Sequence, residues 1–314
     1  MFSQTELNEW YDSNEPDLDW IEKPSRHQFR WRTKEGRWIT HNRRIKNSNS
    51  FKKIFKEKAP TDLYIGTSAW LNPIDLPRIK QTDLPSPILI KHHIVFDIDL
   101  RPFCYTRLEK ARKITNSLVN WLENNENLEL IYISYSGSKG FHIVLKDIDR
   151  TLFGIENPRE RENKIRQSRK ELLQRVISAG FPVDKTVTAD TRRIIRLPGS
   201  LHGTNGWVCT RISRDKLATP LKKWVDDLPR HPKAKKMQYW PIKIYEIPLL
   251  FIGFIFKMVG KNKPKKINKI SKNYEGEKEN ITSLQVSSHV IGTKDRSAII
   301  LWMPEHWKEK QKRI

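Results

Sequence analysis

The stretch HIVFDIDL, His93 to Leu100, decides how we interpret the rest of the chain. Its apolar side chains are typical of a strand from the middle of a sheet: Ile94, Val95, Phe96, Ile98 and Leu100. Asp97 and Asp99 stand two apart, so they project from one face with side chains ~7 Å apart. Two unpaired carboxylates there repel each other and resist desolvation unless cations hold them. Since Mg²⁺ and Mn²⁺ prefer oxygen ligands, the pair predicts a divalent-metal site; aspartates that cap a helix or pair with arginines are the alternative.

The composition is strongly basic. The 314 residues carry 59 lysines and arginines against 36 aspartates and glutamates, a formal net charge of +23. This exceeds what solubility requires and indicates a polyanionic partner, with nucleic acid favoured over an acidic membrane surface. A lysine-rich surface without such a partner is the alternative. The length allows one large domain or two modest ones.

The cysteines and apolar runs disfavour several classes of protein. Cys104 and Cys209 stand outside any CxxC or Cys/His cluster, so we expect no structural zinc and no disulfide framework. The polar stretch MFSQTELNEWYDSNE at the N-terminus is not a secretory signal. The longest apolar run, Ile247 to Phe256, is shorter than the ~20 residues that cross a bilayer, and we interpret it as a buried strand or a partner-docking segment. We therefore expect a cytoplasmic protein with no membrane partner.

Basic and aromatic residues mix between positions 20 and 60, as in FRWRTKEGRWITH. The alternation on either side of Lys34-Glu35-Gly36 predicts an amphipathic hairpin. Aromatic faces can stack on bases while guanidinium groups meet phosphates, and whether this hairpin touches nucleic acid stays open. A short strand is expected next, around Leu63 to Gly66, followed by a proline-marked loop, Leu76 to Pro87.

The middle of the chain alternates helices and strands. Apolar spacing predicts helices over Thr106 to Glu123 and Pro158 to Ile177, with Gly180 ending the second. Strands are expected over Glu129 to Ser134, over Phe141 to Leu145 and, as at least two short pieces, over residues 181–212. We therefore predict an α+β fold in which a sheet has helices on one side.

The character of the sequence changes near Val259. Lys261 to Asn280 is rich in Lys, Asn and Glu and is typical of a linker or mobile arm, and Ser288 to Trp302 could form a further hairpin. We divide the chain into a folded domain over residues 1–230, which we expect to carry the activity, and a basic C-terminal extension over residues 231–314, which we expect to be partly disordered or partner-docking.

Two glycine turns carry polar side chains that suit phosphates. SYSGSKGFHIVL places Ser136, Lys139 and His142 in and after a tight turn, where glycines let backbone N–H groups approach an anion. An ordinary glycine hairpin with a structural histidine is the alternative. RRIIRLPGSLHG brings arginines and His202 to a second turn, and Asp184 in FPVD is a candidate third carboxylate. Together these groups suit one task, holding a nucleoside triphosphate and two metal ions for phosphoryl or nucleotidyl transfer.

These pieces together resemble the archaeo-eukaryotic primase superfamily and, within it, the small catalytic subunits of archaeal DNA primases. The segments that carry the resemblance occur in the family's order: Phe96 to Asp99, Ser136 to His142, Val183-Asp184 and Arg193 to Gly203. PTDLYIGTSAWLNP is also similar to the segment that precedes the family's DxD strand. The resemblance covers about residues 25–225 and implies a primase-type mixed or antiparallel sheet core with flanking helices.

The resemblance also implies roles for individual residues. Asp97, Asp99 and Asp184 would be the catalytic carboxylates that bind two Mg²⁺ or Mn²⁺ ions, with Asp190 as a competing third acid. The triphosphate of the incoming nucleotide would be contacted by a set of five residues: Ser136, Lys139, His142, His202 and Arg196. A structural role stays equally open for Arg196 and for its neighbour Arg193.

The implied activity is that of a DNA primase, a DNA-directed nucleotidyltransferase of EC 2.7.7 type that makes short RNA or DNA primers in DNA replication. The implied partners are a single-stranded DNA template, nucleoside triphosphates and, as a candidate, a large primase subunit in a primosome. Two alternatives stay open. One is a stand-alone primase-polymerase acting in end joining, lesion bypass or plasmid replication, and the other is a catalytically degenerate nucleic-acid-binding module.

Three departures from the family pattern matter. The family's small subunits carry a zinc-binding knuckle, which two isolated cysteines cannot make. They also have a longer, usually helical insertion between the histidine turn and the third aspartate, where only one helix fits here. Basic residues are frequent in the family where this chain has Ser138 and Thr204. These changes put in doubt how template and large subunit are engaged and how tightly nucleotide is held.

Overall fold

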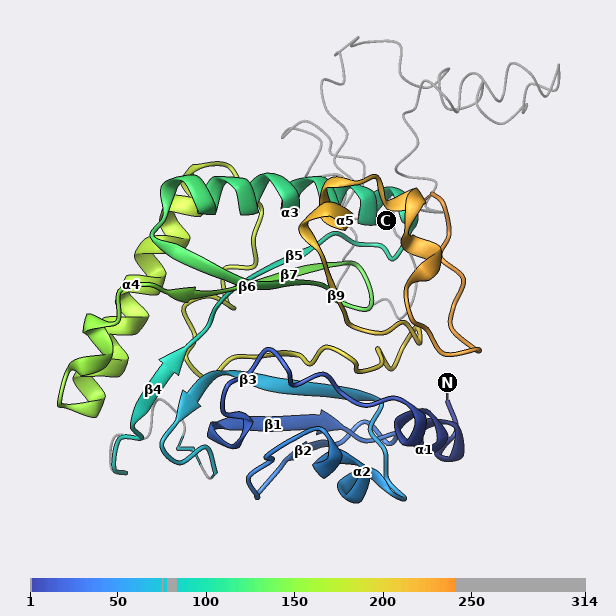
Figure 1. Ribbon diagram of the computed structural model, residues 1–314, viewed down its shortest axis with the longest axis horizontal. Coiled ribbons are helices and arrows are strands. Elements are labelled where there is room, and N and C mark those ends of the chain that lie inside the picture. The colour runs from blue at the N-terminus through green and yellow to red at the C-terminus, as the bar shows by residue number, and fades with distance from the viewer. Residues whose placement is uncertain (1, 75, 78–83, 241–314) are drawn as a thin grey trace, which may run out of the picture. The chain divides into compact units, whose positions relative to one another are not determined.

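Two antiparallel sheets form the centre of the computed structural model, which describes residues 2–74, 76–77 and 84–240 (Figure 1). The first sheet has the order β2-β1-β3-β4, with β8 also pairing with β3, and the second has the order β5-β7-β6-β9. The strands are β1 (His27–Arg32), β2 (Trp38–Thr40), β3 (Asp62–Trp70), β4 (Leu89–His92), β5 (Ile94–Asp99), β6 (Leu128–Tyr135), β7 (Gly140–Asp147), β8 (Ile194–Arg196) and β9 (Thr210–Ile212).

Helices flank both sheets. The α-helices are α1 (Gln4–Ser13), α2 (Asn49–Phe55), α3 (Tyr105–Asn125), α4 (Pro158–Ser178) and α5 (Arg214–Ala218). Single 3₁₀ turns are η1 (Pro24–Arg26), η2 (Thr151–Gly154), η3 (Leu221–Lys223) and η4 (Val225–Asp227). The predicted α+β class, the hairpin and the two long helices are confirmed. None of the helices in the described ranges has both the length and the apolar character needed to cross a membrane.

The expectation of a single sheet was wrong, because the chain changes sheets between two strands that are separated by one residue, His93. β4 ends at His92 and pairs with β3, whereas β5 begins at Ile94 and pairs with β7. Between them the backbone nitrogen of His93 donates to the carbonyl oxygen of Thr67 at 2.9 Å. An apolar run indicates a buried strand without indicating its partner, so the sequence did not reveal the switch.

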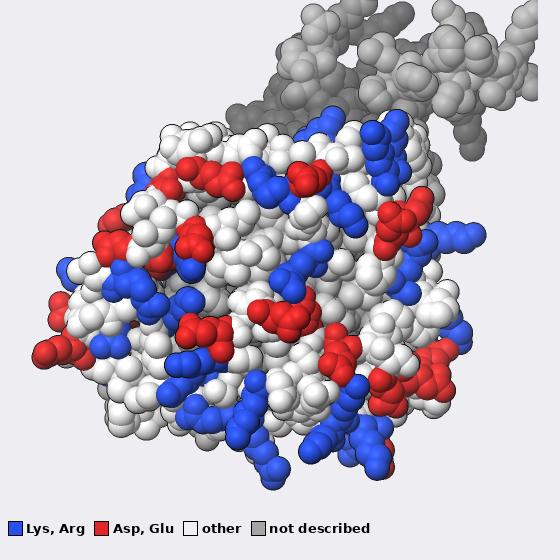
Figure 2. All heavy atoms as spheres, viewed as in Figure 1, with Lys and Arg blue, Asp and Glu red and all other residues white. Residues whose placement is uncertain are grey.

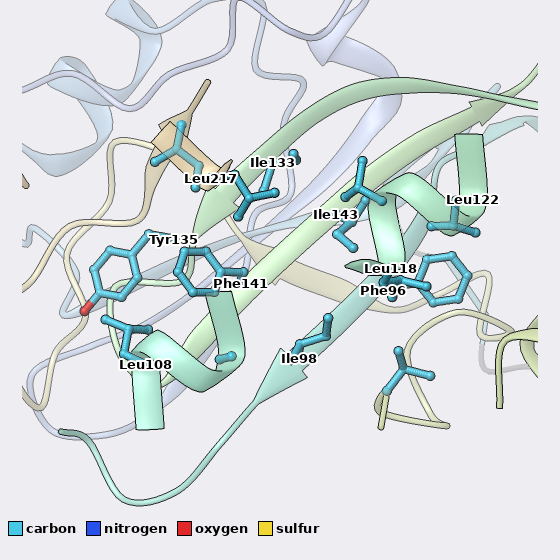
Figure 3. Packing of buried hydrophobic residues seen from close by; sticks show 14 of the residues in the cluster. Phe96, Ile98, Leu108, Leu118, Leu122, Ile133, Tyr135, Phe141, Ile143 and Leu217 are labelled. Carbon is cyan, nitrogen blue, oxygen red and sulfur yellow. The ribbon is translucent and has the colours of Figure 1, made fainter. Parts of the chain in front are cut away.

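β5 buries both of its faces in different cores. Ile94, Phe96 and Ile98 pack in one cluster with α3 and with the C-terminal part of α4, as Figure 3 shows for Phe96 beside Leu118. Val95, on the opposite face, belongs to a second cluster that includes residues of the first sheet. Because residues two apart share a face, Asp97 and Asp99 lie on the face of Val95, which is turned toward the first sheet.

Local signals explain where α4 begins and ends. The side chain of Asn157 accepts hydrogen bonds from the backbone nitrogens of Arg159 and Glu160, and Pro158 occupies the first helical position. Gly180, just past the last turn, has a φ of +88°, the left-handed conformation that ends many helices. α4 therefore spans nearly the predicted residues.

The hairpin of β1 and β2 presents two unlike faces. Phe29 and Trp31 are buried against Phe51 and Phe55 of α2, with ring centroids 5.5 and 5.4 Å apart. Arg30 and the residues that alternate with this pair lie on the other face of the sheet. The predicted amphipathic hairpin is thus a structural element with one apolar side.

Residues 231–240 pack on the rest of the described chain. His231 is buried, and Trp207 donates from Nε1 to the carbonyl oxygen of Lys235 at 2.9 Å. The predictions for 247–256, 261–280 and 288–302 fall outside the described residues.

Candidate active site

Seven of the eight predicted site residues line one cavity of about 230 Å³ between the two sheets. They are Asp97, Asp99, Ser136, Lys139, His142, Arg196 and His202. β5 and β7 supply residues from the second sheet, and β3 and β8 supply residues from the first. A larger cavity of about 720 Å³, around Trp207 and Tyr239, contains none of the predicted set. Chemistry, rather than size, identifies the candidate site.

Strand pairing places the acids opposite the glycine turn. In the register of β5 with β7, Asp97 faces His142 and Asp99 faces Gly140. A Cβ atom on Gly140 would lie 1.8 Å from the carbonyl oxygen of Ile98, so only glycine allows the strands to approach this closely. The turn that holds Ser136 and Lys139 is thereby fixed beside the two aspartates.

Asp97 is in an unfavourable environment for a carboxylate. Its Oδ1 atom is buried, and no described residue forms a hydrogen bond with it. Burial, followed by repulsion from Asp99 and then Asp184, raises the pKa of Asp97 to about 8. The Nε2 atom of His142 lies 3.9 Å away, beyond hydrogen-bond distance. Burial and repulsion from its neighbours thus outweigh the opposing charges of Arg193 and Lys139 at this carboxylate.

Asp184 contacts Asp97 through a hydrogen bond between their backbones. Its backbone nitrogen donates to the carbonyl oxygen of Asp97 at 3.0 Å. Its Oδ1 atom accepts from the backbone nitrogen and the hydroxyl of Thr186, both at 2.8 Å, and its Oδ2 atom lies 3.9 Å from Arg193. Asp184 is outside the residues that line the cavity but near enough to repel Asp97. The competing acid, Asp190, instead accepts from the backbone nitrogen of Arg192 at 3.0 Å.

These acids fit a hard divalent cation. An orphaned buried oxygen and a strongly raised pKa are what three neighbouring carboxylates show before a cation compensates them. In the part of the chain that the structure describes, no three His, Cys, Asp or Glu side chains stand close enough to form a preassembled metal site. The side chain of Asp184 would therefore have to turn away from Thr186 to share a cation with Asp97.

The glycine turn presents its polar groups to the cavity. Gly137, at a φ of +80°, lies against the backbone of residues 207–209, where a Cβ would come within 3.1 Å of the carbonyl oxygen of Trp207. The Ser136 hydroxyl accepts from the backbone nitrogen of Gly140 at 3.3 Å. Lys139 is mostly buried, and its Nζ atom lies 3.6 Å from Oδ2 of Asp99. The positively charged ammonium group of Lys139 therefore lies beside the acid Asp99.

The two histidines are neutral in the unliganded site. Burial lowers the pKa of His142 to about 4, and burial together with the charge of Arg196 lowers that of His202 to about 4. The Nδ1 atom of His142 is 3.4 Å from the Ser134 hydroxyl, and Nδ1 of His202 accepts from the backbone nitrogen of Thr204 at 3.4 Å. Their imidazoles can donate hydrogen bonds to an anion without contributing a fixed charge.

Arg196 lines the cavity but already has protein partners. Its guanidinium forms an ion pair with Asp62 at 2.8 Å and donates to the carbonyl oxygen of Leu201 at 2.8 Å and to the Tyr64 hydroxyl at 3.0 Å. These contacts join β8 to β3 and favour a positioning role. Arg193, which also lines the cavity, is more exposed and has only Asp184 at ion-pair distance among the described residues.

Sequence reasoning missed Tyr64 and Asp62 as parts of the site. Tyr64 lines the cavity, and Asp62 holds both Arg196 and, at 3.0 Å, the backbone nitrogen of Gly203. Their alternation with Leu63 and Ile65, both buried in the core, was a readable signal that they share the opposite face.

Figure 2 shows acidic and basic side chains interleaved on the face in view, so net charge by itself does not mark the binding surface there.

Known proteins that are similar to this chain in sequence include the small subunits of archaeal DNA primases. The DNA primase small subunit PriS of Pyrobaculum calidifontis is 24% identical over 233 residues, covering 62% of this chain and 72% of that protein. PriS of Pyrobaculum aerophilum is 24% identical over 246 residues, covering 66% and 77%. A shorter match to PriS of Haloarcula marismortui reaches 54% identity over 52 residues, 16% of this chain and 13% of that one. These matches support the resemblance to the archaeo-eukaryotic primase superfamily that the sequence motifs indicate.

No family model matches this chain. Among solved structures, it is similar to the polymerase domain of Mycobacterium tuberculosis ligase D in complex with DNA, with a TM-score of 0.46 and 13% identity over 72% of this chain and 89% of that one.

Proposed function

We propose that this primase-superfamily protein is a template-directed nucleotidyltransferase that synthesises short primers from nucleoside triphosphates, in the manner of a DNA primase small subunit. The observation that carries the proposal is the buried, unpartnered Oδ1 of Asp97, with Asp99 and Asp184 beside it and the Ser136–Gly140 turn opposite. Such a cavity suits a metal-bound triphosphate, whose negative charge and cations compensate one another.

The residues would divide the work as follows. Asp97, Asp99 and Asp184 would hold two Mg²⁺ or Mn²⁺ ions. When bound, such ions would lower the pKa of the attacking 3′-hydroxyl and stabilise the leaving pyrophosphate. Lys139 would contact the triphosphate with its ammonium group and Ser136 with its hydroxyl. His142 and His202 would donate hydrogen bonds to the phosphate oxygens, and an anion there would raise the pKa of both imidazoles.

The role of Arg196 in the proposal is to position the site. Its ion pair with Asp62 and its bond to Tyr64 hold β8 against β3, which places His202 and Arg193 at the cavity. Arg193, whose guanidinium is more exposed, would face the phosphates.

The partners follow from the chemistry of the reaction. We propose a single-stranded DNA template, nucleoside triphosphates and a large primase subunit, with the catalytic work done by residues 1–230 and the basic extension, 231–314, serving partners. A role in DNA replication and a cytoplasmic location belong to the same proposal.

The direct test is incorporation of labelled nucleotide by the purified full chain. Single-stranded DNA, Mn²⁺ or Mg²⁺, and labelled NTPs or dNTPs are supplied with and without a primer. We expect Asp97→Asn to lower incorporation at least ~100-fold, because the cations that would compensate the transition-state charge lose a carboxylate ligand, and to leave single-stranded DNA binding unchanged. The matched control is Asp149→Asn, an exposed aspartate outside the cavity. Near-normal incorporation by Asp97→Asn would overturn the proposal.

A further inference from the structure

One face of the first sheet extends from the wall of the cavity to the edge of that sheet. On β1, Arg30 and Arg32 lie on the face opposite to Phe29 and Trp31. Cross-strand register then sets two rows on this face: Thr40, Arg30, Tyr64 and Arg196 in one, and Trp38, Arg32 and Asp62 in the other. Tyr64 and Arg196 line the candidate active site, so the first row leads from its wall to the edge strand β2, and the second row runs beside the first.

Trp38 forms the outer end of this surface. Its side chain is 48% exposed, although it is the bulkiest residue of β2. Its ring centroid lies 5.2 Å from that of Tyr64, at an interplanar angle of 44°. The guanidinium carbons of Arg30 and Arg32 lie 5.2 and 5.9 Å from the centre of the Trp38 ring. An aromatic side chain held in this way is fixed in position while keeping about half of its surface available.

The arginines here are not neutralised. Among the described residues, no carboxylate lies at ion-pair distance from Arg30 or Arg32, in contrast to Arg196 with Asp62. The Nε atom of Arg30 is buried without a hydrogen-bond partner in the same ranges. A buried donor without a partner is costly, which indicates a ligand atom that the protein does not supply.

We propose that Arg30, Arg32 and Trp38 form a platform for single-stranded nucleic acid at the entrance to the cavity. One base stacks on the Trp38 ring, and the two guanidinium groups bind adjacent phosphates. An exposed indole beside unpaired arginines matches a strand whose bases are free to stack, whereas a duplex hides its base faces. Stacking on an aromatic ring depends little on which base is bound, and this suits a template strand because a template can have any sequence. The identity of this strand as the template rests on the proposed function.

The opposite face of β2 provides a matched control. Ile39 is also exposed, at 39%, and pairs with Trp31 on the other face of the sheet. Lys53 of α2 carries an exposed charge behind the same sheet, where α2 packs. Substitutions at these two positions remove similar surface or charge without touching the platform.

The test is fluorescence anisotropy of a labelled single-stranded oligonucleotide with the full chain in EDTA. We expect Trp38→Ala to raise Kd roughly tenfold, the usual effect of losing one stacked base, with Trp38→Phe recovering most of the affinity. Ile39→Ala should bind as the wild type does. Arg30→Gln and Arg32→Gln should each lower the slope of log K against log salt by about 0.7, the effect of one phosphate contact to a single strand, and Lys53→Gln should not.

Thermal unfolding of every variant shows that each is folded before binding is compared. Trp38→Ala binding as tightly as Ile39→Ala would overturn the platform, as would an unchanged salt slope in both arginine variants. Either result, combined with lost incorporation in Asp97→Asn, refutes the platform and leaves the proposed function standing. Normal incorporation in Asp97→Asn with weakened binding in Trp38→Ala refutes the proposed function and leaves a single-strand platform.

Discussion

The backbone nitrogen of Asp184 donates a hydrogen bond to the carbonyl oxygen of Asp97, at 3.0 Å. This bond joins the segment after α4 to the strand that carries the other two acids. It fixes the third acid beside β5 at the backbone, while its side chain stays bonded to Thr186 and free to exchange that contact for a cation. The backbone therefore places Asp184 beside Asp97 without fixing its side chain there.

Asp184 and Asp190 are the two candidates for the third acid, and we expect Asp184 to be the one that acts. We expect Asp184→Asn to reduce nucleotide incorporation by ~100-fold, because Asp184 is one of the carboxylates that acts on Asp97. Asp190→Asn should retain activity within a few-fold if the loop stays folded, since its side chain accepts a hydrogen bond from the local backbone nitrogen of Arg192. Steady-state incorporation with Mn²⁺ measures both. The reverse order of activities would reassign the third acid.

The raised pKa of Asp97 predicts how metal and pH affect stability. The folded pKa of about 8 is above the ordinary 3.8, so the folded state favours the protonated carboxyl. Its contribution is fully present below about pH 4 and is lost as pH rises toward 8. In EDTA we expect Asp97→Asn to unfold at a higher temperature than the wild type, by at least ~2 °C at pH 8 and by less at pH 5.

Manganese should reverse that difference. In thermal unfolding at pH 8, Mn²⁺ should raise the Tm of the wild type and leave that of Asp97→Asn nearly unchanged, because ligand binding to the folded state alone is stabilising. Equal shifts in the two proteins would show that the ion binds elsewhere.

Gly140 and Gly154 provide a matched pair for the packing of the glycine turn. A Cβ on Gly140 would collide with the backbone of Ile98 at 1.8 Å, whereas one on Gly154 would meet nothing within 4 Å. We expect Gly140→Ala to lower the free energy of unfolding by ~2–4 kcal/mol, since the strands must separate, and Gly154→Ala to change it by less than ~0.5 kcal/mol. Urea unfolding followed by circular dichroism gives both values. A Gly140→Ala protein as stable as Gly154→Ala would contradict the close pairing of β5 and β7.

Two buried histidines predict loss of stability in acid. The rings of His27 and His93 stack with centroids 5.5 Å apart, and burial lowers the pKa of His27 to about 4 and that of His93 well below its usual 6.5. As pH falls below 6.5, the two histidines become protonated in the unfolded chain but stay neutral in the folded chain. Stability is therefore lost between about pH 6.5 and 4.

The size of this effect can be isolated at one position. For His27 the loss amounts to about 3 kcal/mol when complete. His27→Gln keeps a donor for the carbonyl oxygen of Gly66, which lies 2.9 Å from Nδ1 of the histidine, but does not titrate. We expect urea unfolding of His27→Gln to show a shallower decline between pH 7 and 5 than the wild type. Parallel declines would mean that His27 is protonated in the folded state.

Much of the fold was predictable because its signals are local. The spacing of apolar residues placed α3 and α4, and the alternation around Gly36 placed the hairpin. The division into two sheets was not predictable, because β4 and β5 follow each other with one residue between them and are assigned to different sheets by the distant strands with which they pair.

The sequence by itself determined which residue types could perform the chemistry: two aspartates on one strand face, a third acid, and two glycine turns with histidines. Side-chain chemistry and strand periodicity are properties of short segments, so they can be read locally. Only the tertiary structure decided that seven of the eight predicted side chains share a cavity, that the backbone of Asp184 bonds to that of Asp97, and that Arg196 is held by Asp62. Those relationships depend on contacts between segments far apart in the chain, where burial and the nearest charges set each pKa and each partner.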